Sequence, residues 1–246
     1  MELRLATQLD KHGLYALWQE AFGDSKETIN LFFDAADYKN IPVISENGKI
    51  VSALYLIPTE IVSGSKKFSA YYIYAAATLK SQRKKGLMAK LLEFCSQLAK
   101  DRNIDYLFLK PEEEKLFNYY EKQGFKTAFY ETEKRLYKCE NIKKYSYVNW
   151  NTTVFELECK FNETELFKSE NGLAELETDT DSISVIAFLS ENANKLFNDI
   201  KKAYPENDIF IGLPSDSKTG IKTGMLKKIN DNAENPDNIY LGICLQ

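Results

Sequence analysis

Three cations and a glycine in consecutive positions form the most specific chemical feature of the chain: Arg83, Lys84, Lys85 and Gly86. They stand where an apolar run ends and an amphipathic segment begins, so the turn is expected to open a helix. A helix start leaves backbone N–H groups unpaired and carries positive partial charge, which attracts phosphate oxygens. Gly86 lets the backbone approach a ligand, because it has no Cβ. The turn therefore predicts a phosphate site, with a solvated basic loop that caps a helix as the alternative.

The elements that must position this turn follow one another closely. An apolar strand is predicted at residues 67–79, an amphipathic helix at residues 87–99 and a buried strand at residues 106–109. A second helix opens at Pro111 and stops at Gly124. The turn has neither the G-x-G-x-x-G pattern nor a Gly-Lys-Ser/Thr ending, so it is not one of the glycine-rich phosphate loops.

The chain before the turn is predicted to form a short strand at residues 3–6, then two helices and three antiparallel strands. Gly23 ends the first helix and Ser25 can cap the second. Asn-Gly within residues 46–49 predicts a hairpin, because these residues accept positive φ. Pro58 is expected to bulge or end the strand after this hairpin, since proline donates no ladder hydrogen bond. Residues 125–137 are predicted to return as one strand.

The composition narrows the classes of function. The chain has 246 residues, with 32 basic and 36 acidic side chains and a formal net charge of -4, which argues against a nucleic-acid binder with a broad basic surface. No apolar run approaches the roughly 20 residues that span a bilayer. The four cysteines show no C-x-x-C pairing and His12 is the single histidine, so neither a metal site nor a histidine triad is expected. A cytoplasmic protein without a metal is the expectation.

The pattern R-x-x-G-x-(small or Met), followed by helix, strand and Tyr-x-x-x-Gly-Phe, resembles the GNAT family of acyl-CoA-dependent N-acetyltransferases. The resemblance covers residues 3–137 in element order. It implies an α/β (α+β) GNAT fold, with a mixed, mostly antiparallel central sheet flanked by helices, and it implies acetyl-CoA as cosubstrate. Met88 stands where the family usually has Gly or Ala, but the expected contact uses backbone N–H. The residues implied to bind the coenzyme are Ala76, Ala77, Thr78, Arg83, Lys84, Lys85, Gly86, Leu87, Met88 and Ala89.

Tyr120 is the candidate catalytic acid by the same resemblance. It stands four residues before Gly124 in a segment similar to the family signature Y-E-K-x-G-F. Such a tyrosine can protonate the departing thiolate. The alternative is an aromatic side chain that packs on its helix, a role for which Tyr119 is better suited. The family often has an Asn upstream of this tyrosine, and here residues 112–114 are all Glu.

Glu60 is the candidate general base. An amine must lose a proton before it attacks a thioester, and a carboxylate can accept that proton directly or through water. Glu60 follows the expected strand break, although an exposed strand glutamate is the alternative. Tyr55, Tyr72 and Tyr74 could line an acceptor pocket, but alternation along a strand turns about half of its side chains toward the core.

The sequence texture changes near residue 139, where acidic and amide residues become more frequent. The predicted organisation is a coenzyme-binding catalytic domain at residues 1–138 and a smaller, degenerate GNAT-like α+β domain at residues 139–246, by resemblance to a bacterial two-domain group. Strands are also predicted at residues 172–176, 224–226 and 239–245, and a strand–helix–strand order at residues 182–213 echoes the first part. Because this second part has no basic turn, one coenzyme site is expected per chain.

The leading hypothesis is acetyl transfer from acetyl-CoA to a primary amine by direct attack in a ternary complex. The alternative is an acyl-CoA-binding regulatory module without turnover, and a third reading is a scaffold that binds no coenzyme. The expected partners are acetyl-CoA and an amine-bearing acceptor, without nucleic acid or membrane, and self-association stays open.

Overall fold

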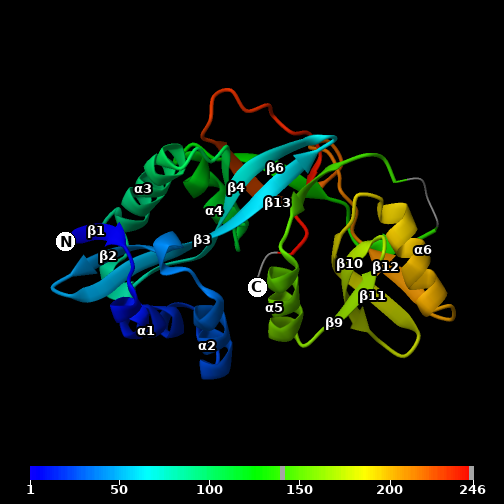
Figure 1. The fold of residues 1–246 in the computed structure, drawn as a ribbon, viewed down its shortest axis with the longest axis horizontal. Helices are drawn as coiled ribbons and strands as arrows, with labels where there is room; N and C mark the ends of the chain where they lie inside the picture. Colours follow the sequence, from blue (N-terminus) through cyan, green and yellow to red (C-terminus); the bar gives the residue numbers. More distant parts are fainter. Residues whose placement is uncertain (139–141, 244–246) are drawn as a thin grey trace.

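The computed structural model of the protein describes residues 1–138 and 142–243 (Figure 1). The helices of the first part are α1 (Lys11–Phe22), α2 (Lys26–Ala35), α3 (Leu87–Asp101) and α4 (Glu114–Glu121). Its strands are β1 (Glu2–Leu5), β2 (Pro42–Glu46), β3 (Lys49–Ser63), β4 (Lys66–Thr78), β5 (Tyr106–Leu109), β6 (Lys126–Glu131) and β7 (Arg135–Leu136). The predicted order of elements up to residue 131 is confirmed.

The second part contains two helices, α5 (Thr152–Asn162) and α6 (Ala193–Ala203). Its strands are β8 (Ser146–Asn149), β9 (Glu165–Ser169), β10 (Gly172–Thr178), β11 (Ser182–Leu189), β12 (Asp208–Ile211), β13 (Ile221–Lys228) and β14 (Ile239–Tyr240). No helix in the described part of the chain is long and apolar enough to cross a membrane.

A nine-stranded mixed sheet has the order β1-β2-β3-β4-β5-β13-β6-β14-β8. β3 also pairs with β8 at residues 60–62, so the strands from β3 round to β8 close into a ring. Side chains from every part of this ring meet in one buried cluster, which includes Tyr72, Phe108, Phe129 and Trp150. The ring therefore has a packed aromatic interior, and β8, β13 and β14 complete it from the chain beyond residue 138.

Helices cover both faces of the β1–β4 end of this sheet (Figure 1). α1 packs on β3 and β4 from one side, and α3 packs on β2, β3 and β4 from the other. The buried side chains of β3 are therefore continuous rather than alternating, because both faces of the strand are covered. The predicted α/β class with a mixed sheet flanked by helices is confirmed.

The expected break at Pro58 is wrong. β3 runs through Pro58, which pairs with Tyr71 of β4, and the register shift lies between Ala53 and Tyr55 instead. On its other side β3 pairs with β2 up to Ala53 and with β8 from Glu60. Pro58 thus lies where that edge of β3 has no partner strand among the described residues, so its missing N–H disrupts no ladder.

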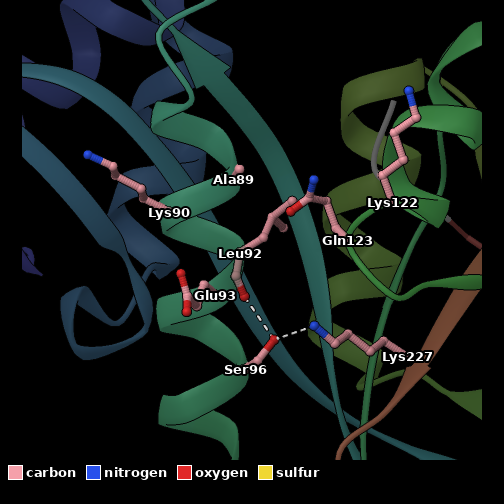
Figure 2. Close-up of a pocket in the computed structure, with 8 residues that line it drawn as sticks. All are labelled: Ala89, Lys90, Leu92, Glu93, Ser96, Lys122, Gln123 and Lys227. Atoms are coloured by element: carbon pink, nitrogen blue, oxygen red, sulfur yellow. Dashed lines mark hydrogen bonds between the residues drawn. The ribbon is translucent and has the colours of Figure 1, made fainter.

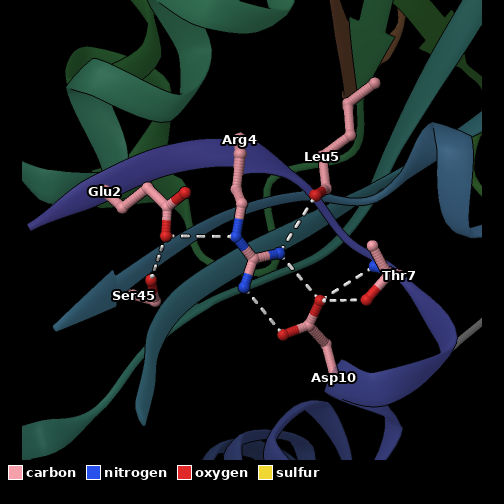
Figure 3. Close-up of polar contacts among 6 residues, drawn as sticks. All are labelled: Glu2, Arg4, Leu5, Thr7, Asp10 and Ser45. Atoms are coloured by element: carbon pink, nitrogen blue, oxygen red, sulfur yellow. Dashed lines mark hydrogen bonds and ion pairs between the residues drawn. The ribbon is translucent and has the colours of Figure 1, made fainter. Parts of the chain in front are cut away.

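An ion pair fixes the entry to α1 (Figure 3). Both terminal nitrogens of Arg4 contact the Asp10 carboxylate, Nη1 at 2.7 Å and Nη2 at 2.9 Å. Asp10 also accepts the backbone N–H of Thr7 at 2.8 Å, as in a capping box. The Arg4 contact lowers the pKa of Asp10 to about 2. This contact ties the edge strand β1 to the helix that covers the sheet.

A second sheet has five strands in the order β7-β12-β11-β10-β9, and α6 packs on it. β9, β10 and β11 are antiparallel, and β12 returns parallel to β11 after α6. The same order of three antiparallel strands, helix and parallel strand occurs in β2, β3, β4, α3 and β5. The division of the chain at residue 138 stays a prediction, and strands from beyond that residue lie in both sheets.

The sequence patterns did not predict strands β8 and β9. The segment at residues 125–137, predicted as one strand, forms two strands, β6 and β7. β6 belongs to the nine-stranded sheet and β7 to the five-stranded sheet, so the chain crosses between sheets at residues 132–134. Cys95 and Cys159 are buried free thiols. Cys139 and Cys244 lie outside the described residues.

Candidate active site

A cavity of about 1000 Å³ opens where β4 and β5 separate. The parallel pairing of these strands ends at Tyr72↔Phe108. Beyond that point residues 77 and 78 of β4 pair with β3 on one side and border the cavity on the other. A strand edge of this kind can pair through its backbone with an extended ligand.

The basic turn forms the mouth of this cavity. Lys84 and Gly86 both take positive φ, 63° and 75°, within three residues. Alternation of this kind gathers backbone N–H groups into an anion-binding concavity. α3 begins immediately afterwards at Leu87, and no side chain caps its first N–H groups. These donors therefore remain available to a phosphate group.

Neighbouring contacts hold the turn in position. Glu20 of α1 accepts the backbone N–H of Lys80 at 2.8 Å. Arg83 Nε donates to the Thr78 carbonyl at 3.1 Å, and Lys85 Nζ donates to Gln82 Oε1 at 2.7 Å. Lys85 is thus engaged within the turn itself.

Most of the predicted site residues border this one cavity. They are Ala76, Ala77, Thr78, Arg83, Lys84, Gly86, Leu87, Met88, Ala89 and Tyr120. Lys85 and Glu60 are not among its lining residues. The roles assigned to these residues stay predictions.

Tyr120 lies on α4 with its ring against two other aromatics. Its centroid is 5.3 Å from that of Tyr119 and 5.9 Å from that of Phe125. Burial, with a smaller contribution from Tyr119, raises the pKa of the Tyr120 phenol to about 12. The phenol therefore keeps its proton at neutral pH, as a general acid must.

Glu60 lies in a different environment, at the point where β3 meets β8. Its Oε2 accepts from Lys67 Nζ at 3.1 Å and from Asn149 Nδ2 at 3.3 Å. The Lys67 contact is the main cause that lowers the pKa of Glu60. A carboxylate with a lowered pKa holds a proton less readily, and its role as base stays a prediction.

Other cavity residues were not predicted as functional. The α1 end contributes Trp18, Phe22 and Asp24, and the segment between β5 and α4 contributes Lys110 and Glu112. The sequence around Asp24 indicated a helix start, since the residue follows Gly23 and precedes the capping Ser25. Asp24 borders the cavity because of the way α1 packs against β4. The sequence pattern around Asp24 does not predict that packing.

Glu131, at the end of β6, has a carboxyl group whose pKa is raised. Burial is the main cause that raises its pKa to about 7, and Lys110 and Lys134 partly oppose this shift. Glu131 forms a bridge with Pro214, in the segment that follows β12. It therefore lies at the seam between the two parts of the chain, near Lys110 of the cavity wall.

A smaller cavity, of about 310 Å³, lies between α3, the end of α4 and β13 (Figure 2). Its charged lining residues are three lysines and one carboxylate, Lys90, Lys122, Lys227 and Glu93. Burial lowers the pKa of Lys227, whose ammonium also lies 5.7 Å from the Phe125 ring centre. Ala89, on the first turn of α3, lines both cavities, so the two cavities adjoin at the start of that helix.

Comparison with known proteins gives this geometry a context. Residues 2–128 match the family model described as an acetyltransferase (GNAT) domain. No curated protein matches the chain. A GCN5-related N-acetyltransferase from Anabaena variabilis superposes with a TM-score of 0.67 at 14% identity, over 93% of this chain and 73% of that one. Eis1 from Mycobacterium abscessus superposes with a TM-score of 0.69 at 10% identity, over 94% of this chain and 74% of that one.

These structural likenesses concern the fold, since the identities are low. The family model covers more than half of the chain, and its general chemistry is acyl transfer from an acyl-CoA. The protein therefore belongs to the GNAT acetyltransferase family.

Proposed function

We propose that the protein transfers an acetyl group from acetyl-CoA to a primary amine by direct attack in a ternary complex. The observation that carries this proposal is one cavity that joins the β4 edge, the basic turn and the protonated Tyr120. The β4 edge suits the pantetheine arm, and the turn suits the pyrophosphate. The lysines of the smaller cavity would attract the phosphate at the adenosine end.

Each step of this reaction needs few groups from the chain. The acceptor ammonium first releases a proton to water, and the neutral amine attacks the thioester carbonyl carbon. The carbon–nitrogen bond forms as the carbon–sulfur bond breaks, and the Tyr120 phenol gives its proton to the leaving sulfur. The proton lost from the new amide nitrogen restores the phenol through water. Holding amine and thioester side by side supplies much of the acceleration.

Two features of the second part of the chain argue that it holds no coenzyme site of its own, so that each chain binds one coenzyme. α6 corresponds in order to α3, but its first turn is capped by its own side chain, since Asn192 accepts from the Lys195 N–H. Residues near β14 also lie against the part of β11 that extends beyond its pairing with β12. Tyr240 stacks on Phe188 with centroids 4.2 Å apart, and the backbone at Gly242 closely approaches the Phe188 carbonyl.

The test is thiol release from acetyl-CoA with a panel of amines, together with titration of the coenzyme. Turnover with at least one amine and one coenzyme per chain is the expected result. Coenzyme binding without thiol release from any amine would support the alternative, a regulatory module without turnover. The free thiols of Cys95 and Cys159 suit a reducing compartment, so we propose the cytoplasm as the location.

A further inference from the structure

The turn between α1 and α2 carries a carboxylate whose backbone is fixed at both ends. Gly23 takes a left-handed conformation, φ 79°, and its N–H donates to Gln19 O at 3.1 Å to end α1. Ser25 Oγ accepts the Thr28 N–H at 3.1 Å and starts α2. Asp24 stands between these two caps and borders the large cavity. Its position is therefore set before any ligand arrives.

The Asp24 side chain accepts a hydrogen bond from a buried donor. Trp18 Nε1 donates to Asp24 Oδ2 at 2.6 Å. Trp18 is 2% exposed, and its ring lies 4.8 Å from that of Phe32 and 5.2 Å from that of Tyr55. No other hydrogen bond or ion pair to Asp24 forms within the described ranges. One carboxylate oxygen is fixed by the indole, and the charge has no cationic partner there.

Aromatic residues line the same cavity as this carboxylate. Phe22 is 43% exposed although it is a large apolar residue, and it borders the same cavity as Asp24. Tyr74 of β4 lies on that wall too, with its ring 5.7 Å from Trp18. Aromatic faces favour both apolar groups and ammonium groups. A carboxylate on such a wall suits a cation attached to an apolar body.

The charges of the cavity separate its two expected occupants. Arg83, Lys84 and Lys110 are the cations of its lining, and the first two belong to the turn that suits the pyrophosphate. Asp24 lies on the α1 side, and the other acidic lining residue, Glu112, lies in the segment before α4. An amine would be repelled by the turn and attracted to Asp24.

We propose that Asp24 binds the ammonium group of the acceptor, and that the acceptor is a primary amine whose aromatic or alkyl body lies on Phe22 and Tyr74. This assignment rests on the proposed amine acetylation. Asp24 holds the reacting nitrogen in its charged form. Once the nitrogen loses its proton to water, the ion pair no longer holds it and the neutral amine attacks the thioester.

Equilibrium binding to the full chain saturated with CoA tests this assignment without any need for turnover. Phenethylamine is the probe, and 2-phenylethanol is its neutral counterpart with the same body. We expect Asp24→Asn to weaken phenethylamine binding by about 10- to 100-fold, as for the loss of a charged hydrogen bond. Binding of 2-phenylethanol and of CoA should change less than about twofold. Asp34→Asn, at an exposed carboxylate paired with Lys11, is the matched control and should alter neither.

Trp18→Phe provides a second variant, because it keeps an aromatic ring and removes the indole donor. It should weaken phenethylamine binding less than Asp24→Asn does. Equal phenethylamine affinity in wild type and Asp24→Asn overturns the assignment. So does failure of the wild type to bind phenethylamine, or binding of the alcohol as tight as that of the amine. If phenethylamine binding depends on Asp24 but no amine gives thiol release, the assignment of Asp24 is supported and the proposed acetylation is contradicted.

Discussion

Lys227 Nζ donates a hydrogen bond to Ser96 Oγ at 2.9 Å, although 131 positions separate the two residues in the chain. The contact joins β13, near the end of the chain, to α3, which begins at the basic turn (Figure 2). Ser96 Oγ in turn donates to the Leu92 carbonyl at 2.9 Å. The last part of the chain thus supplies a cation to the smaller cavity, which shares Ala89 with the cavity at the basic turn.

Lys227→Met tests whether that cation contacts the adenosine end of the coenzyme. The change should weaken CoA binding by about 3- to 10-fold, as for one partly exposed phosphate contact, and leave dephospho-CoA binding unchanged. The thermal midpoint should not fall, because burial already disfavours the Lys227 charge and Met keeps the apolar stem. Calorimetric titration of both ligands checks this. Lys195→Met removes an exposed charge on α6 and should change neither affinity.

Gly86→Ala tests the basic turn, with Gly48→Ala as its control. The two glycines have φ of 75° and 76°, and a Cβ at either would meet no atom within 4 Å. Each change should therefore cost about 1–2 kcal/mol of folding free energy through backbone strain alone. Acetyl-CoA affinity should fall at least about tenfold in Gly86→Ala, as for two lost backbone hydrogen bonds, and stay constant in Gly48→Ala. Equal affinities in the two variants would contradict the turn as the pyrophosphate site.

Tyr120→Phe should lower kcat by about 10²-fold and leave the Kd of acetyl-CoA unchanged, because it removes the proton donor and keeps the ring. Tyr119→Phe is the control and should retain activity. Since the pKa of Tyr120 is about 12, the wild type should show no alkaline loss of kcat from this group up to about pH 10. Thiol-release kinetics across pH provide the measurement, and an alkaline limb removed by Tyr120→Phe would contradict the raised pKa.

Glu131→Gln should change how stability depends on pH. The carboxyl has a pKa of about 7 in the folded state against 4.5 in the reference state, so the folded state binds its proton more tightly. Its contribution to stability is present below pH 4.5 and is lost as pH rises through about 7. The Gln variant should thus gain on the wild type by about 1–3 kcal/mol between pH 4 and pH 8. Denaturant unfolding at several pH values checks this, and a difference independent of pH would rule it out.

Glu60→Gln addresses the candidate base. Its ion pair with Lys67 and its position outside the cavity lining lead us to expect a kcat within about twofold of the wild type. The sequence-based assignment of Glu60 as base instead predicts a loss of about 10²–10⁴-fold, as for removal of a general base. Thiol release at saturating acetyl-CoA decides between the two values, with Lys67→Met as a control for the ion pair alone.

The element order of the first part could be predicted because its signals are local. Gly23, Ser25 and Gly124 mark helix ends through their own backbone preferences, and the apolar period of α3 needs no distant partner. Pro58 was misjudged for a nonlocal reason, because its effect depends on whether a strand pairs with that edge of β3. β8 is short and gains its pairing from β3 and β14, which lie far from it in the chain. β9 is a short edge strand that pairs only with its neighbour β10 among the described residues.

The sequence by itself determined the basic turn, which we propose as the coenzyme side of the site, since Arg83 to Gly86, the strand before them and the helix after them are continuous in the chain. Only the tertiary structure decided which residues face the proposed acceptor side. Asp24 reaches the cavity because α1 packs on β4, and Lys227 reaches α3 because β13 inserts between β5 and β6. Contacts between distant segments follow from the packing of whole elements, which the spacing of residues along one segment does not encode.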